Sequence, residues 1–154
     1  MAQMYQNNHR QQPFRGGRSP SLQPPATPSV PVKFYLDAEK TQLNPTLLNV
    51  DAEKQADQLH QKINSAQIRR FFGEIKNLSL RLQQGRPWTQ IEPLFRMLRS
   101  KAAYASGTSK ITSEFSTFIS ENVDRVKDQR DFEAFVLYFE AMLGFAYGKG
   151  LVKK

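Results

Sequence analysis

Basic side chains are concentrated in one stretch of this 154-residue chain, from Lys62 to Lys101. That stretch holds nine Lys and Arg residues against two acidic residues, a net charge of +7, whereas the whole chain carries +8. Guanidinium and ammonium groups bind phosphate oxygens through charge-assisted hydrogen bonds. Tyr104 follows Lys101 by three residues, and an aromatic ring beside a cation can stack on a nucleobase. The stretch therefore predicts a surface that binds a polyanion, single-stranded nucleic acid in particular.

Helical geometry sorts the first of these bases by flank, since residues three or four apart share a helix face. Arg70 precedes Glu74 by one turn, so we expect the two side chains to pair. Arg69 and Lys76 lie on the other flank with Gly73 between them, and we expect no acidic residue to compete there. That flank is therefore predicted to be open to a phosphodiester.

A second basic helix is expected directly after the first. Its residues Arg96 and Arg99 share one flank, while Lys101 and Tyr104 occupy the opposite flank. An ordinary solvated helix face is the alternative interpretation of each cluster taken alone. Taken over both helices, the predicted nucleic-acid-binding residues are Arg69, Arg70, Lys76, Arg96, Arg99, Lys101 and Tyr104.

Residues able to perform catalysis are sparse. His9 and His60 are isolated and lack the paired spacing of a metal site, and the chain contains no Cys. No P-loop, G-x-S-x-G elbow or H-E-x-x-H motif occurs. Asp124, Asp128 and Asp131 are interpreted as the end of one helix and the cap of the next. We therefore expect no enzyme, metal site or cofactor, with a metal-dependent nuclease as the alternative.

The apolar spacing that must position the basic residues is helical beyond the first third of the chain. Ser65 is the expected N-cap of the second helix, and Asp128 or Asp131 that of the last. The helices are predicted at about residues 51–63, 65–84, 88–106, 112–127 and 128–147. Short loops join them, so the fold is predicted to be all-α, a compact five-helix bundle.

The third predicted helix turns one apolar stripe toward the core, and the last is apolar on most of its faces. The residues expected to point inward from the third helix are Trp88, Ile91, Leu94, Phe95, Leu98, Ala102 and Ala105. The last helix is polar only along the narrow stripe of Glu133 and Glu140, so it is either central to the bundle or covered by another protein. Its candidate protein-interface residues are Leu137, Ala141 and Phe145.

The first 36 residues differ in composition from the rest. They hold six of the nine prolines and four bases without an acid, including the Arg15-Gly-Gly-Arg18 element. Such a segment buries too little apolar surface to offset the entropy of ordering. Residues 1–36 are predicted to be a disordered basic extension, with RNA binding or simple solubilisation as its role, and residues 37–154 the all-α domain. No apolar run reaches the length of a membrane span, so we expect a soluble intracellular protein.

Three segments together resemble a known family. Residues 65–72 read SAQIRRFF, residues 93–105 read PLFRMLRSKAAYA, and DFEAF at 131–135 is followed by FEA at 139–141. In this order and spacing they resemble the small subunit of type III-A CRISPR Csm effector complexes, over about residues 48 to 149. The Pro-rich start has no counterpart in the family pattern.

The resemblance implies a non-enzymatic, all-α RNA-binding subunit of an antiviral ribonucleoprotein in the cytoplasm. Several copies would stack beside the backbone subunits, along the channel that holds the guide RNA and its paired target RNA. The implied partners are CRISPR RNA, target RNA, the backbone and large subunits, and neighbouring copies. The family's basic positions match Arg69 and Arg70, and its Lys-x-x-Tyr matches Lys101 and Tyr104. A helical protein-interaction module with incidental basic charge is the alternative function.

Overall fold

The computed structural model describes residues 32–59 and 63–153. Within these ranges the chain forms five α-helices, one π-helical turn and two very short strands. In chain order these are η1 (Leu47–Asp51), α1 (Ala52–Asp57), β1 (Ile63–Asn64), α2 (Ser65–Gln83), α3 (Trp88–Gly107), α4 (Ser113–Arg125), α5 (Gln129–Gly148) and β2 (Val152–Lys153). The predicted all-α class is confirmed for the described residues.

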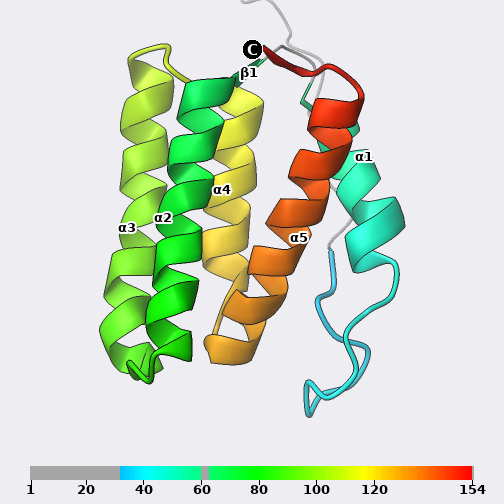
Figure 1. The fold of residues 1–154 in the computed structure, drawn as a ribbon, viewed down its shortest axis with the longest axis vertical. Coiled ribbons are helices and arrows are strands. Elements are labelled where there is room, and N and C mark those ends of the chain that lie inside the picture. The colour runs from blue at the N-terminus through cyan, green and yellow to red at the C-terminus, as the bar shows by residue number, and fades with distance from the viewer. Residues whose placement is uncertain (1–31, 60–62, 154) are drawn as a thin grey trace, which may run out of the picture. The chain divides into compact units, whose positions relative to one another are not determined.

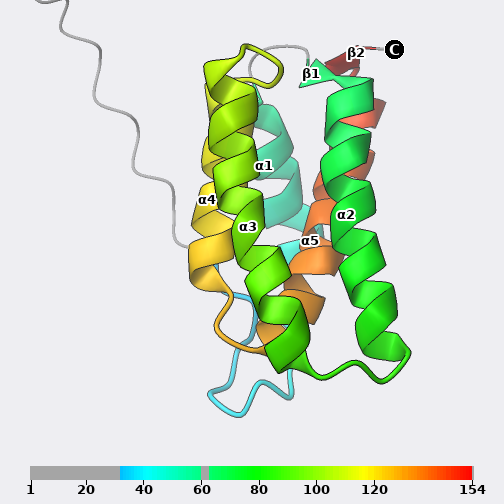
Figure 2. The same cartoon turned by 90° about the vertical axis from the view of Figure 1, so that its left-hand side faces the viewer.

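The four helices α2 to α5 alternate in direction and are joined by short loops (Figure 1). Figure 2 shows α2 and α3 as a hairpin closed at its lower end. Gly85 makes that turn possible, because its φ of 89° lies in the left-handed region that glycine adopts without a steric penalty. The two helices that carry most of the basic residues are therefore direct neighbours.

Side-chain caps start the helices close to the predicted positions. The Asp128 carboxylate accepts a hydrogen bond from the Asp131 N–H at 2.9 Å, so the first of the two predicted caps of α5 is confirmed. At α2 the cap is Asn64, one residue before the predicted Ser65, and its Oδ1 accepts from the Ala66 N–H at 2.9 Å. The helix boundaries from α2 onward thus follow local signals in the sequence.

The first helix is shorter than predicted. α1 ends at Asp57, and Ile63, expected on the same helix, belongs to β1. Its N–H donates to the Leu151 carbonyl at 3.0 Å, and β1 pairs in parallel with β2 in the register Ile63 to Val152. Ile63 is buried as its spacing predicted, but a partner far along the chain gives it strand geometry.

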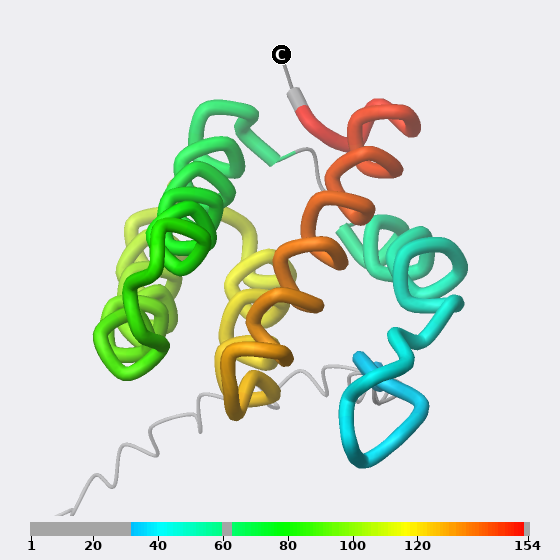
Figure 3. Tube along the Cα trace, turned by 60° about the horizontal axis from the view of Figure 1, so that its bottom comes forward, coloured from blue at the N-terminus to red at the C-terminus, as the bar shows by residue number. Residues whose placement is uncertain are grey.

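Aromatic side chains join α5 to the other helices at the centre of the core. Phe139 of α5 meets Phe118 of α4 at a ring-centroid distance of 5.1 Å and Phe72 of α2 at 5.4 Å. Phe132 of α5 meets Phe95 of α3 at 5.1 Å. Figure 3 shows α5 between α1 on one side and the group of α2, α3 and α4 on the other. The apolar character of α5 is thus explained mainly by its central position.

Leu94 does not point inward as predicted, because 41% of its surface is exposed. The buried stripe of α3 consists of Ile91, Phe95, Leu98, Ala102 and Ala105. At 3.6 residues per turn Leu94 falls at the edge of that stripe, on the flank shared with Met97 and Lys101. The α3 flank that carries Lys101 is therefore more apolar than the sequence analysis indicated.

The packed structure begins before the predicted boundary at residue 36. Phe34 lies in the core, and the Arg125 guanidinium lies 5.8 Å from the centroid of its ring. The Tyr35 hydroxyl donates to the Arg130 carbonyl at 2.7 Å. Residues 32–36 therefore belong with the helical domain, whereas residues 1–31, the rest of the extension predicted for residues 1–36, lie outside the described residues.

The loop before η1 is fastened to the start of α5 by Lys40, whose Nζ lies 2.5 Å from Asp128 Oδ2 and 2.8 Å from Asp131 Oδ1. Burial opposes the Lys40 charge, but the hydrogen bonds to both carboxylates outweigh burial and raise its pKa. Burial also opposes the charge of Asp128 and by itself would raise the pKa of that carboxyl. The hydrogen bonds from Lys40 and the Asp131 N–H outweigh burial, so the pKa of Asp128 is lowered. Ionised Lys40 and Asp128 thus stabilise this contact.

Candidate nucleic-acid interface

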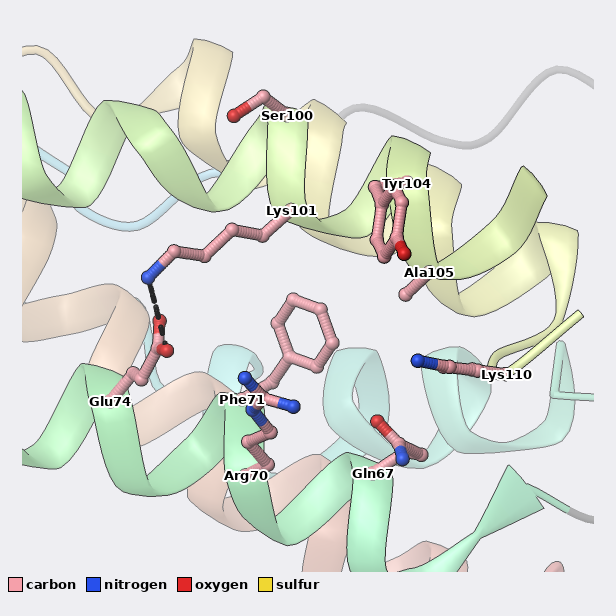
Figure 4. Close-up of a pocket in the computed structure, with 9 residues that line it drawn as sticks. All are labelled: Gln67, Arg70, Phe71, Glu74, Ser100, Lys101, Tyr104, Ala105 and Lys110. Atoms are coloured by element: carbon pink, nitrogen blue, oxygen red, sulfur yellow. Dashed lines mark hydrogen bonds and ion pairs between the residues drawn. The ribbon is translucent and has the colours of Figure 1, made fainter. Parts of the chain in front are cut away.

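The facing sides of α2 and α3 enclose a pocket of about 290 Å³ (Figure 4). Its lining combines an apolar floor with a cationic and aromatic rim. The lining residues are Gln67, Arg70, Phe71, Glu74, Ser100, Lys101, Tyr104, Ala105 and Lys110. Three of the predicted nucleic-acid-binding residues, Arg70, Lys101 and Tyr104, are thereby brought to one place. We call this site the α2–α3 pocket.

The ion pair in the α2–α3 pocket differs from the predicted one. Glu74 accepts hydrogen bonds from Lys101 Nζ at 2.9 Å and 3.0 Å, so the pair joins α2 to α3. The expected pair between Arg70 and Glu74 does not form, since a base on the neighbouring helix occupies the carboxylate. Among the residues that the structure describes, the Arg70 side chain has no hydrogen-bond or ion-pair partner. Its guanidinium is therefore available to an external anion.

Lys110 is a member of the α2–α3 pocket that the sequence analysis missed. The Lys110 Nζ lies 5.7 Å from the centroid of the Tyr104 ring. The backbone N–H of Lys110 donates to the Ala105 carbonyl at 2.8 Å. That backbone bond, with Ser109 at a φ of 56°, turns the chain back across the end of α3. The available signal was a basic residue three positions after Gly107, where α3 ends.

Three cations and one carboxylate give the α2–α3 pocket a local excess of positive charge. Arg70, Lys101 and Lys110 carry it, and Glu74 neutralises only one of them. Tyr104 exposes 67% of its surface at the rim, an unusual position for a large aromatic side chain. Cations beside an exposed ring form the chemical arrangement that binds phosphate and stacks an aromatic base.

Arg69 and Lys76 lie elsewhere, on the side of α2 that faces α5. Arg69 Nε donates to the Tyr147 hydroxyl at 3.1 Å, with the guanidinium 5.8 Å from the centroid of that ring. Lys76 Nζ lies 3.4 Å from Glu140 Oε2. The expectation that no acid competes on this flank is wrong, because α5 supplies the carboxylate.

Arg96 and Arg99 face α4. Arg99 forms an exposed ion pair with Asp124 at 2.8 Å. Arg96 Nη2 donates to the Val126 carbonyl at 2.9 Å, and Nη1 donates to the Val123 carbonyl. These carbonyls belong to the end of α4, which has no further helical turn to satisfy them. Arg96 thus holds the end of α4 in place.

The predicted binding residues consequently occupy three edges of the hairpin rather than one face. Arg69 and Lys76 point to α5, and Arg96 and Arg99 point to α4. Arg70, Lys101 and Tyr104 lie between α2 and α3. Helical periodicity identified each flank correctly but not the carboxylates that neighbouring helices bring to it. Of the three edges, the α2–α3 pocket has the largest excess of cations over acids, three against one.

The candidate protein-interface residues share one outward edge of α5. Leu137 exposes 45% of its surface, whereas Ala141 and Phe145 are half-buried and pack against the core. At the end of α5, Lys149 pairs with Asp57 at 2.6 Å and with Glu53 at 3.0 Å, which fastens α1 there. Hydrogen bonds to these two carboxylates raise the pKa of Lys149.

Residues 32–59 and 63–153 hold no candidate metal centre and no membrane-spanning helix. In these ranges no group of three or more His, Asp or Glu residues is placed to hold a metal ion. His9 and His60 lie outside the described residues. None of the described helices is both long enough and apolar enough to cross a membrane.

The fold and the α2–α3 pocket define the class: a small helical-bundle protein with a cationic, aromatic-rimmed groove. Comparison with known families is more specific, since the sequence model of the family Csm2 Type III-A matches residues 42–150, more than half of the chain. The chain belongs to this family, the small subunit of type III-A CRISPR Csm complexes, and the resemblance found in the sequence is confirmed. Searches of curated proteins and of solved structures found no match.

Proposed function

We propose that this Csm subunit is a non-catalytic, RNA-binding structural component of its complex, which contacts the paired guide and target RNA in the cytoplasm during antiviral defence. Its partners are the CRISPR RNA, the target RNA, the backbone and large subunits, and neighbouring copies of itself. The observation that carries the proposal is the α2–α3 pocket, where three cations meet one carboxylate beside an exposed tyrosine.

Binding at this site depends on charge rather than on reading the sequence of the bases. Arg70, Lys101 and Lys110 attract phosphates, which every RNA presents in the same way. Guide and target recognise each other by base pairing, so the protein has no need to read their sequence. The expected behaviour is affinity that tolerates any sequence and falls steeply with salt.

The other predicted residues contribute less to this proposal. Partners on neighbouring helices already engage Arg69, Lys76 and Arg99. The exposed ion pairs of Lys76 and Arg99 are worth only about 0–1 kcal/mol, so a phosphate can replace their carboxylates. Arg96 is engaged by the carbonyls of α4. We therefore place the centre of RNA binding at Arg70, Lys101 and Tyr104, with the exposed bases at its margins.

Filter binding of single-stranded RNA tests the proposal. We expect the double variant Arg70→Ala, Lys101→Ala to bind more weakly and to show a shallower dependence of log K on log salt. Each phosphate contact on a single strand contributes about 0.7 to that slope, so the loss of two lowers it by about 1.4.

The matched control removes two exposed lysines away from the α2–α3 pocket. Lys54 lies on α1 and Lys127 lies in the loop before α5, so Lys54→Ala, Lys127→Ala changes the net charge equally. The control should keep the slope of the unmodified protein. Equal slopes for both double variants would show that binding reflects total charge, and the proposed site would be wrong.

Stacking of copies is proposed to use the outward edge of α5. Leu137, Ala141 and Phe145 present an apolar strip there, which a neighbouring copy would cover. Light scattering at increasing concentration should show self-association that Leu137→Glu weakens. Val50→Glu is the control, since Val50 exposes a similar 43% of its surface on η1. Association unaffected by Leu137→Glu would assign the interface to another surface.

A further inference from the structure

The α2–α3 pocket has an apolar base, which phosphate binding alone does not require. Phe71 and Ala105 form its floor, and both are almost fully buried. A surface that only holds a phosphate backbone needs cations in solvent and no apolar floor. An apolar floor beneath a cationic rim instead suits a ligand with a flat apolar part and an anionic part.

The polar groups are distributed unevenly around this floor. Figure 4 shows Tyr104, Lys110 and Gln67 at one end of the α2–α3 pocket and the pair of Lys101 with Glu74 at the other. The end near Tyr104 holds the Lys110 cation, the Gln67 amide and the tyrosine ring, and no carboxylate among the lining residues. At the opposite end Glu74 holds Lys101 in place through both of its oxygens. An anionic aromatic ligand is therefore favoured at the Tyr104 end.

The size of the pocket restricts that ligand. Pockets for drug-sized molecules have volumes of about 300–1,000 Å³, and this one, at about 290 Å³, lies just below the smallest of them. The space suits one nucleotide and not a stacked run of bases. A base paired within a duplex cannot enter it, because its faces are covered by its neighbours.

We propose that the α2–α3 pocket receives one unstacked nucleotide of the bound RNA, its base stacked on Tyr104 and its phosphate held by Arg70 and Lys110. This inference rests on the proposed RNA-binding function and specifies how the pocket holds one nucleotide that lies outside the base-paired part of the bound RNA. Lys110 lies against the Tyr104 ring at 5.7 Å, which keeps the ring beside the cation that meets the phosphate.

The pocket accepts any of the four bases. The Gln67 amide has both donor and acceptor atoms at the Tyr104 end, and it can turn either of them toward a base edge. Stacking on a ring is equally tolerant, because every base has a π face. The pocket therefore recognises the presence of an unpaired base and not its identity.

The experiment compares two RNA oligonucleotides of equal length and charge, one with all its bases and one with abasic residues throughout its central segment. Filter binding with the full chain should show tighter binding of the base-bearing RNA, on the order of tenfold as for one base stacked on an aromatic ring. Tyr104→Ala should abolish this difference and Tyr104→Phe should keep it. Tyr147→Ala, which removes the tyrosine beside Arg69, is the control and should also keep it.

The outcomes separate this inference from the function on which it rests. Equal affinity of the unmodified protein for both oligonucleotides would overturn the inference and leave phosphate binding intact. A persistent difference in Tyr104→Ala would overturn it as well, because the base would then lie elsewhere. Failure to bind either oligonucleotide would overturn the proposed function and this inference together.

Discussion

Replacing Arg96 by alanine is expected to destabilise the fold rather than to remove a contact with RNA. The Arg96 guanidinium bridges the carbonyls of Val123 and Val126 at the end of α4 and pairs with Glu92 at 2.8 Å. Its side chain is 35% exposed, so water can replace part of what the alanine removes. The two carbonyls lose charge-assisted hydrogen bonds that are each worth about 1.5–3 kcal/mol when shielded from solvent.

After allowance for this exposure we expect Arg96→Ala to cost about 2 kcal/mol of unfolding free energy. A domain of this size loses about 4 °C of melting temperature per kcal/mol, so the variant should melt about 8 °C lower. Urea unfolding followed by circular dichroism measures the free energy, and a thermal scan measures the midpoint. Arg96→Lys should recover only part of the loss, since one ammonium does not match the planar fork that spans two carbonyls.

Arg99→Ala is the matched control, one turn further along α3. Arg99 makes an exposed ion pair with Asp124, and such pairs contribute about 0–1 kcal/mol. The reasoning would be refuted if Arg96→Ala unfolded at the same urea concentration as the unmodified protein while RNA affinity fell. Arg96 would then act as a binding residue, as its position among the bases of α3 first indicated.

Two further predictions concern charges elsewhere in the fold. Glu74→Gln removes the carboxylate of the α2–α3 pocket, so RNA should bind several-fold more tightly and with a steeper salt dependence in filter binding; unchanged affinity would show that RNA does not approach Lys101. Asp128 has a lowered pKa in the folded protein, so its contribution to stability is present above its ordinary value near 4 and is lost as pH falls through the lowered value. Lys40→Met should therefore lower the urea midpoint at pH 7, and the gap to the unmodified protein should narrow toward pH 2. A gap independent of pH would mean that the contact is not electrostatic.

Local signals were sufficient to predict most of the fold. Caps and apolar stripes placed α2 to α5 within a few residues of their observed ends. The end of α1 could not be predicted, because Ile63 takes its geometry from Leu151 across the bundle. Spacing indicated most of the buried side chains, although not the exposed Leu94, whereas a strand pair of two residues depends on a partner that only the fold brings near.

The candidate site was predictable in its residue types but not in its pairing. Arg70 and Glu74 are one turn apart, yet the carboxylate goes to Lys101 of α3. Lys76 likewise meets Glu140, which is 64 residues away. The partner of an exposed base is set by the packing of neighbouring helices, since several acids lie within reach of a long flexible side chain. Helix periodicity alone therefore cannot separate an available cation from an occupied one.

The pairing of β1 with β2 has a consequence for the order of folding. That pair joins residues about ninety positions apart, whereas the whole α2–α3 pocket lies on the contiguous segment from Gln67 to Lys110. Contacts of low sequence separation form first, because they cost less loop-closure entropy. The α2–α3 hairpin can thus assemble before the ends of the bundle are joined, and a transient opening of the β1–β2 pair leaves the pocket intact.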